Sequence, residues 1–381
     1  MINKVEIHNF KSHKNTILQL SNLTVLCGVN AVGKSSAIQP LLLLREAFLN
    51  KTDFEYLDLL SNSIKIGTAQ DAIYEFSDED IISFKLNILG QDNEFNFETE
   101  KRDLTKTLIN ESKSKRNAYK KEIINNYSLF NSNFHYISAA RLGPQSSYPK
   151  DDVIVEKYKQ ISVNEGKAEY CINFLDKYQG RKVVQSLCNN LVQFNDLLSQ
   201  TTAWEKEISQ GINVIIKDNG KLGYELKFQF QTQISIGKTN EFNASNVGFG
   251  VSYVLPIIVA ILSSEPGALL IFENPEAHLH PKGQAKIAEL ICIAAQAGIQ
   301  IIIETHSDHI INGILVQCKK FEENIKGISK DNVSLYHFSM KEKEPYTIAN
   351  KINIEKGGLI RYTPKEFFDQ FTIDRKYLMG F

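Results

Sequence analysis

Residues 28–35 read Gly28-Val29-Asn30-Ala31-Val32-Gly33-Lys34-Ser35, and this stretch decides the fold. Its two glycines and the closing Lys-Ser pair match the pattern of a phosphate-binding loop. The apolar run Leu23–Cys27 before it predicts a strand, and apolar residues at helical spacing from Ala37 to Phe48 predict a helix after it. Because strand, glycine loop and helix follow in this order, we expect a phosphate-binding site here.

The loop predicts ATP and Mg²⁺ as ligands. Glycines let the backbone wrap closely, so that successive N–H groups and the start of the helix face the phosphates. Lys34 is expected to neutralise the β- and γ-phosphates, and Ser35 to ligate Mg²⁺. The predicted nucleotide contacts are Gly28, Asn30, Ala31, Val32, Gly33, Lys34, Ser35 and Ser36.

An acidic residue ends a second apolar strand. The run Ala268–Phe272 is followed by Glu273, whose carboxylate is costly to bury without a partner. We therefore predict that Glu273 binds Mg²⁺ or positions the attacking water. Asn274 and Glu276 follow it closely and are also candidate catalytic residues.

A histidine follows a third apolar strand. The run Gln300–Ile303 leads into His306, which we predict to sense the γ-phosphate through a hydrogen bond. The alternative is a zinc cluster of His278, His280 and His306. Zinc clusters usually use cysteine or a histidine pair on one helix, and Pro281 interrupts any helix here, which disfavours this alternative.

A second glycine pair opens the apolar helix pattern Tyr253–Leu262. Glycines at the start of a helix offer backbone N–H groups to an anion. Gly248, Gly250 and Ser252 are therefore predicted to contact nucleotide, with an ordinary capped helix as the alternative.

The composition indicates a globular protein of 381 residues, 43% apolar, with a formal net charge of −1. This charge provides no global basic field for nucleic acid or membrane. The five cysteines lack zinc or disulfide spacings, which favours a reducing, cytoplasmic location. The apolar runs are too short to span a membrane. The lysine-rich residues 101–127 also contain acidic residues, which favours a solvated face over a nucleic-acid patch.

Changes of pattern along the chain predict four parts. They are an N-terminal ATPase lobe (1–100), a helical insertion (101–210), a C-terminal ATPase lobe (211–340) and a small C-terminal segment (341–381).

Alternating apolar and polar residues predict strands within both lobes. Residues 82–100 are expected to form a β-hairpin that turns around Gly90–Asn93. In the second lobe, Ile212–Ile216 and Tyr224–Ile236 are expected to be strands joined by a turn at Asp218–Gly220.

The motifs, taken in this order, resemble the ABC ATPases of the RecF/SMC/OLD type, which are found in DNA repair, chromosome organisation and bacterial anti-phage defence. Ile7–Ser12 is similar to the group's N-terminal signature, Gly28–Ser35 to its Walker A motif, Glu273–Pro281 to its Walker B motif and D-loop, and Glu304–Ser307 to its switch histidine. The resemblance implies an α/β fold, an ABC-ATPase head with mixed β-sheets around a P-loop core and an inserted helical subdomain.

The resemblance assigns three further regions. Asn246–Ser252 stands where the family places its signature motif, which reaches the nucleotide of a second subunit. The Q-loop region falls near residues 136–145, where Arg141 or Gln145 is the candidate nucleotide contact. The tail Ile352–Phe381 is similar to a small C-terminal segment of unknown function on some of these bacterial ATPases.

One position departs from the family pattern. Where many members have two adjacent acids, this chain has Glu273 and then Asn274. An amide cannot take a proton from water. Either Glu276 acts as the base instead, or Asn274 only orients the water and hydrolysis is slow and stimulated by a partner. We favour slow turnover.

The resemblance implies a homodimer or a higher even oligomer, with each nucleotide held between two subunits. The residues after Ser307 are fewer than a usual domain, so we expect a separately encoded effector, a nuclease or toxin, and a role in anti-phage defence. The alternative is a RecF-like DNA-repair ATPase that binds DNA. A transporter subunit fits the motifs poorly, and no membrane partner is expected.

Overall fold

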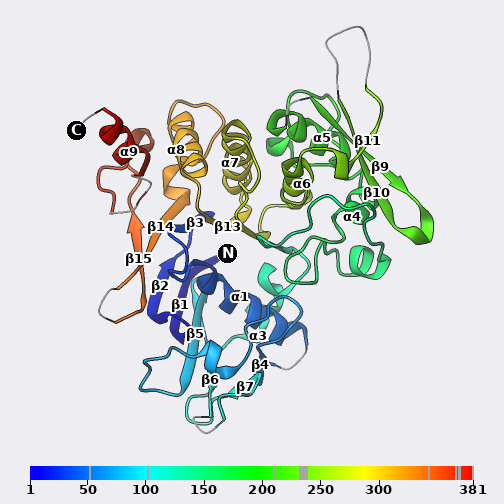
Figure 1. Cartoon of the computed structure of the whole chain (residues 1–381). Helices are drawn as coiled ribbons and strands as arrows, with labels where there is room; N and C mark the ends of the chain where they lie inside the picture. Colours follow the sequence, from blue (N-terminus) through cyan, green and yellow to red (C-terminus); the bar gives the residue numbers. More distant parts are fainter. Residues whose placement is uncertain are drawn as a thin grey trace.

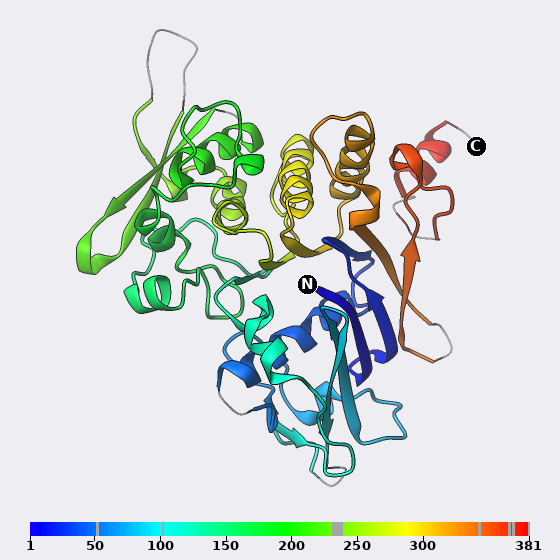
Figure 2. The same ribbon diagram turned by 180° about the vertical axis from the view of Figure 1, so that it is seen from behind.

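The computed structural model describes residues 1–50, 53–100, 103–209, 211–230, 239–341, 344–364, 367 and 370–379. The described strands form two six-stranded sheets and one three-stranded sheet. Figures 1 and 2 show the N-terminal sheet at the lower end of the molecule and the helices of the second half of the chain toward its upper end. This mixed α/β architecture confirms the predicted fold class.

The sheet that carries the phosphate-binding loop has the strand order β15-β14-β3-β13-β12-β8. Neighbouring strands from β14 to β8 run parallel, and only β15 pairs antiparallel, with β14. Parallel strands buried on both faces read as continuous apolar runs, which is why β3, β12 and β13 were visible in the sequence. Their bounds are β3 Leu23–Gly28, β8 Phe134–Ile137, β12 Leu269–Glu273, β13 Gln300–Thr305, β14 Val333–Met340 and β15 Thr347–Ile352.

Helices cover both faces of this sheet. Alternate side chains of β12 point to opposite faces, so Leu270 and Phe272 join one buried cluster and Leu269 and Ile271 join the other. The first cluster contains residues of α6 (Phe249–Leu262), α7 (Pro281–Gln296) and α8 (Asp308–Glu322), and the second those of α1 (Lys34–Leu49). Figure 1 shows α7 and α8 on the opposite side of the sheet from α1.

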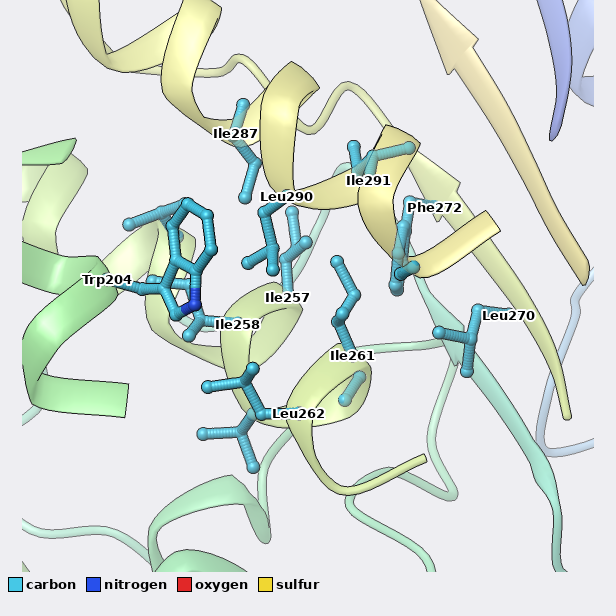
Figure 3. Packing of buried hydrophobic residues seen from close by; sticks show 14 of the residues in the cluster. Trp204, Ile257, Ile258, Ile261, Leu262, Leu270, Phe272, Ile287, Leu290 and Ile291 are labelled. Carbon is cyan, nitrogen blue, oxygen red and sulfur yellow. The ribbon is translucent and has the colours of Figure 1, made fainter. Parts of the chain in front are cut away.

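Helix α6 is apolar on every side, which is typical of a helix that is buried within the molecule. Figure 3 shows Ile257, Ile258 and Ile261 of this helix between Trp204 of α5 (Leu197–Ile208), Leu290 of α7 and the β12 side chains. Every residue of α6 from Val251 onward is buried, whereas its first residue, Phe249, is exposed. The helix therefore presents only its N-terminal end to solvent.

The second six-stranded sheet is antiparallel, with the order β2-β1-β5-β6-β7-β4. It contains the predicted hairpin, which is confirmed as β5 and β6. The turn itself is Leu89 and Gly90, both at positive φ (51° and 81°), so Gln91–Asn93 belong to β6 and not to the turn as predicted. The bounds are β1 Ile2–Phe10, β2 His13–Gln19, β4 Tyr56–Asp58, β5 Ile81–Ile88, β6 Gln91–Glu98 and β7 Leu108–Glu111.

The middle of the chain mixes helices with strands. The range predicted as a helical insertion contains α3 (Lys121–Asn126), α4 (Cys171–Lys177) and α5, but it also contains β7 and β8. After it come β9 (Ile212–Asp218), β10 (Tyr224–Phe230) and β11 (Phe242–Asn243), which pair antiparallel. The two strands are joined by a turn as predicted, but it lies later than Asp218–Gly220, because Asp218 is the last residue of β9 and the 3₁₀ helix Gly220–Leu222 forms the turn. The end of the second predicted strand, 231–236, lies outside the described residues.

The described chain also contains two further short α-helices, α2 (Ala69–Ala72) and α9 (Gln370–Leu378). Strand β15 falls in the predicted C-terminal segment, yet it forms the edge of the sheet that carries the phosphate-binding loop. Among the described residues, no helix has the length and apolar character needed to cross a bilayer.

Candidate nucleotide-binding site

A cavity of about 330 Å³ lies where the parallel strands β3, β12 and β13 end. Ligands of open α/β sheets bind outside the carboxyl ends of the strands, where loops and helix N-termini converge. Nine of the predicted site residues line it: Asn30, Ala31, Gly33, Lys34, Ser35, Ser36, Glu273, Asn274 and His306. The sequence did not predict the other three lining residues, Ser12, Ala139 and Glu304.

Backbone geometry explains the glycines of the loop. Gly28 has a φ of 138° and Gly33 a φ of 95°, and residues other than glycine rarely adopt such backbone conformations. A Cβ on Gly28 would lie 2.4 Å from the Phe338 carbonyl oxygen, and one on Gly33 would lie 2.2 Å from the Thr347 hydroxyl. The loop therefore depends on both glycines for its path along β14 and β15.

Residues from both ends of the chain hold the loop. The His13 Nε2 and the Gly33 carbonyl oxygen are 3.0 Å apart, and the Thr347 hydroxyl donates to the Val32 carbonyl at 2.9 Å. Burial lowers the pKa of His13 to about 4, so its ring is neutral and Nε2 carries the proton that the carbonyl accepts. The Ser12 and Thr347 hydroxyls are hydrogen-bonded at 2.7 Å, and this bond links the N-terminal and C-terminal residues that hold the loop.

Lys34 is folded onto its own loop. Its Nζ donates to the Val29 carbonyl oxygen at 2.6 Å, and burial lowers the pKa of the ammonium while Glu304 raises it. A lysine held in this way keeps its charge within the cavity, where a phosphate can displace the carbonyl as its partner.

Two carboxylates stand side by side at the strand ends. Glu273 and Glu304 are paired in the parallel register of β12 and β13. Glu273 Oε1 accepts a hydrogen bond from the Tyr136 hydroxyl at 2.9 Å, and its Oε2 accepts one from the Ala139 N–H at 3.1 Å. Glu304 Oε1 accepts the Ser35 hydroxyl at 2.9 Å. The phosphate-binding loop and both acidic strands therefore meet at one point.

Glu304 is the ionisable residue among the three lining residues that the sequence analysis did not predict. Burial raises the pKa of its carboxyl to about 7, with the neighbouring Glu273 carboxylate as the second cause. Its buried Oε2 has no hydrogen-bond partner among the described residues. A buried carboxylate oxygen without a donor is costly and favours a cation beside it. Its position two residues before His306 was visible in the sequence, but its pairing with Glu273 was not.

These groups fit Mg²⁺. The ion prefers oxygen ligands and usually takes one or two carboxylates together with substrate phosphates. Ser35, Glu273 and Glu304 offer a hydroxyl and two carboxylates on one wall of the cavity. The zinc alternative finds no support, because the described residues contain no cluster of three or more His, Cys, Asp or Glu side chains arranged for a metal.

Asn274 and His306 line the cavity, whereas Glu276 does not. Asn274 has a φ of 44° and donates its N–H to the Glu304 carbonyl at 2.8 Å. Glu276 is turned away, since its Oε1 accepts the His306 N–H at 3.0 Å, and burial raises the pKa of its carboxyl. Burial, with Lys34 as the second cause, lowers the pKa of the His306 ring. A neutral His306 imidazole can donate a hydrogen bond to phosphate.

Arg141 does not contact the cavity, contrary to expectation. Its guanidinium is 3% exposed and donates to the carbonyls of Tyr253, Glu273 and Asn274. It also lies 4.0 Å from the centre of the Tyr253 ring. Arg141 thus ties the end of β12 to helix α6. The other candidate, Gln145, is exposed and also does not line the cavity.

The N-terminal end of α6 does not reach the cavity of its own chain. None of the three contacts predicted there, Gly248, Gly250 and Ser252, lines that cavity. Gly248 is exposed, and a Cβ there would meet no atom within 4 Å. A Cβ on Gly250 would lie 2.4 Å from the His278 carbonyl oxygen. Ser252 is only 4% exposed, since the phase of α6 turns it into the core.

The first prediction concerns the hydrogen bond from the Thr347 hydroxyl to the Val32 carbonyl. Thr347→Val removes the hydroxyl that holds Val32 while keeping the size and β-branching of the side chain. One lost hydrogen bond of about 1 kcal/mol corresponds to roughly fivefold weaker ATP binding. Isothermal titration with ATP and Mg²⁺ measures this effect. Thr347→Ser, which keeps the hydroxyl, is the control and should bind like the wild type, and equal affinity of all three proteins would contradict the role of Thr347.

Comparisons with known solved structures concern the fold of the chain. Two solved structures have the same fold: the SmcHead bound to the C-winged helix domain of ScpA, with 14% identity and a TM-score of 0.54, and the Smc head domain with an extended coiled coil bound to the C-terminal domain of ScpA from Pyrococcus furiosus, with 12% and 0.51. The first match covers 93% of this chain and 98% of the other, and the second 92% and 96%. No curated protein matches the sequence.

The family comparison identifies the chain at the level of sequence. A family described as "AAA domain, putative AbiEii toxin, Type IV TA system" matches residues 23–312, a range that includes the phosphate-binding loop, both acidic strand ends and His306. This range is more than half of the chain. The chain therefore belongs to this AAA-domain family, and its fold is that of the ABC-type ATPases of the RecF/SMC/OLD group.

Proposed function

We propose that this protein binds Mg²⁺-ATP, hydrolyses it slowly and dimerises around it. The observation that carries the proposal is the convergence of Lys34, Ser35, Glu273 and Glu304 on one cavity at the strand ends. A cation, a hydroxyl and two carboxylates in this arrangement suit a nucleotide triphosphate with its metal. Packing alone gives no reason to hold two carboxylates side by side.

The residues divide the chemistry between them. The N–H groups of the loop and Lys34 hold the phosphates, and His306 donates to the γ-phosphate. Bound Mg²⁺ neutralises charge that develops on the phosphate oxygens. Asn274 orients the attacking water but cannot accept its proton. Glu276 is bonded to the His306 backbone, so this arrangement favours slow turnover over a role of Glu276 as the base.

A second copy of the chain completes the site. The N-terminal end of α6 is exposed, at Gly248 and Phe249, while the rest of that helix is buried. A helix N-terminus with unpaired N–H groups suits a γ-phosphate. Because Gly248 does not line the cavity of its own chain, we propose that it faces the nucleotide of the partner subunit, in a two-fold dimer.

The switch controls a separate effector, a nuclease or toxin, in anti-phage defence inside the cytoplasm. The family description, "AAA domain, putative AbiEii toxin, Type IV TA system", supports a role in a toxin–antitoxin system, and the separate effector and the defence role are our proposal. The alternative, a DNA-repair ATPase, receives less support from the lysine-rich segment. Its Lys106, Lys115 and Lys121 form ion pairs with Glu100, Glu94 and Asp53, which reduces the basic field available to DNA.

The dimer is tested by Gly248→Arg. The arginine fits the monomer because the space around Gly248 is open and its φ of −51° is allowed for any residue. At a closed dimer interface, however, it would block the partner's nucleotide. We expect unchanged ATP affinity and complete loss of the dimer formed with Mg²⁺ and a non-hydrolysable ATP analogue, as measured by light scattering.

The control for this variant is Gly180→Arg, which changes an exposed glycine with equally open surroundings. It should dimerise like the wild type. A Gly248→Arg protein that still dimerises would contradict the two-fold arrangement. A Gly248→Arg protein that no longer binds ATP would indicate that Gly248 belongs to the site of its own chain.

Slow turnover is tested by Asn274→Glu. A carboxylate at this position can accept the proton of the attacking water, and general-base catalysis contributes about 10²-fold or more. We expect the steady-state ATPase rate to rise at least tenfold, since the positive φ of residue 274 opposes ideal placement of the new side chain. Asn274→Gln has the same length and the same backbone strain without the base, so it should not accelerate. Equal rates for the Glu and Gln variants would argue against the proposal.

A further inference from the structure

A second and larger cavity, of about 510 Å³, lies beside the nucleotide site. The C-terminal end of α1 forms one wall, and the chain around Ser63, the segment leading into β8 and residues 154–166 form the others. Its volume is within the range of small-molecule sites, which is about 300 to 1,000 Å³. The nucleotide chemistry described above does not use this cavity.

We propose that this cavity binds a second ligand, an anionic metabolite of nucleotide size with a planar ring, of the nucleoside monophosphate class. We further propose that the ligand acts on the ATPase through Tyr136. The binding step stands independently of the proposed ATPase function, whereas the regulatory step rests on it.

Charge on the wall favours an anion with a donor-bearing ring. Arg45 is 5% exposed, and burial lowers its pKa to about 10, so it remains a cation at neutral pH. Its neighbour Glu46 is 9% exposed and accepts the Ser63 hydroxyl. Lys157 lines the same cavity from an exposed position, and its Nζ lies 5.4 Å from the centre of the Tyr158 ring. Arg45 Nη1 donates to the carbonyl oxygens of Leu129 and Asn131, so Arg45 adds positive charge to the wall, whereas Lys157 is the cation that can contact a phosphate directly. The Glu46 carboxylate suits a base that donates hydrogen bonds.

The remaining lining fits a planar heterocycle. The rings of Tyr136 and Tyr158 both line the cavity and offer faces for stacking, which is worth about 1–3 kcal/mol per base in nucleic-acid sites. Asn50, Asn62 and Gln160 also line it, and the Gln160 Nε2 already donates to backbone carbonyls at its own end of the cavity, which leaves its oxygen as the acceptor. Amides carry both donors and acceptors and can pair with the edges of a base. Aromatic faces, amides and cations in one cavity are the combination that a nucleotide requires.

Tyr136 connects the two cavities. Its ring lines the second cavity, and its hydroxyl donates to Glu273 Oε1 in the first at 2.9 Å. The ring packs closely against Gly166, which also lines this cavity, since a Cβ there would lie 2.8 Å from a ring carbon. A ligand that stacks on Tyr136 therefore shifts or fixes the hydroxyl that orients Glu273. Tyr136 acts through Glu273 and is a positioning residue.

Binding is tested in a Lys34→Ala background, in which the phosphate-binding loop lacks its lysine. The probes are AMP, GMP, CMP and UMP, titrated one by one in a calorimeter. We expect at least one to bind with one site per chain, and Lys157→Glu to weaken that binding about tenfold. Lys159→Glu, at an exposed lysine that does not line the cavity, is the matched control and should leave the affinity unchanged.

Two results would overturn the binding site. One is the absence of saturable binding of all four monophosphates up to millimolar concentration. The other is equal weakening by Lys157→Glu and Lys159→Glu, which would show only a general effect of charge. Because Lys34→Ala removes the loop lysine, neither result depends on whether the wild-type protein hydrolyses ATP.

Coupling is tested by the ATPase rate with saturating ATP and Mg²⁺. The monophosphate that binds should change kcat of the wild type and of Lys159→Glu, and it should leave kcat of Tyr136→Phe unchanged. The phenylalanine keeps the ring that lines the cavity and lacks the hydroxyl that contacts Glu273. A ligand that binds but leaves the wild-type kcat unchanged, or that alters Tyr136→Phe equally, would rule out the path through Tyr136.

Discussion

The structure depends on the in-register pairing of Glu273 and Glu304 at the ends of two neighbouring parallel strands. Like charges directly opposite each other destabilise a sheet, and burial adds to the cost. The surrounding groups offset this cost: Ser35, Tyr136 and the Ala139 N–H donate to the two carboxylates, and Lys34 lies in the same cavity. The remaining demand for positive charge is the reason we propose this strand edge as the site of a metal-bound triphosphate.

The same strand edge explains how distant parts of the chain act together. Thr347 near the C-terminus and His13 near the N-terminus hold the phosphate-binding loop, and Arg141 joins the end of β12 to α6. Arg141 therefore connects the end of β12 to helix α6, whose N-terminal end is exposed. The switch that we propose would use this connection to couple the nucleotide to the dimer interface.

Much of this arrangement was predictable, because it rests on local patterns. The glycine loop, the strand ending in Glu273 and the strand before His306 were found as apolar runs that end in polar residues. Glu304 was missed because its importance comes from a register between strands far apart in sequence. Ser252 was expected to contact the nucleotide of a partner subunit, but its position in helix α6 buries its side chain. Arg141 was a candidate nucleotide contact, but its side chain is bonded to backbone carbonyls and does not line the cavity of its own chain.

The affinity for ATP with and without Mg²⁺, compared between the wild type and Glu304→Gln, tests the two-carboxylate site most directly. If Glu304 helps to hold the metal, Mg²⁺ tightens ATP binding in the wild type, and the variant loses about tenfold or more of that tightening. Its affinity without Mg²⁺ should stay the same or improve, because one negative charge near the phosphates is gone. The same Mg²⁺ effect in both proteins would contradict the account.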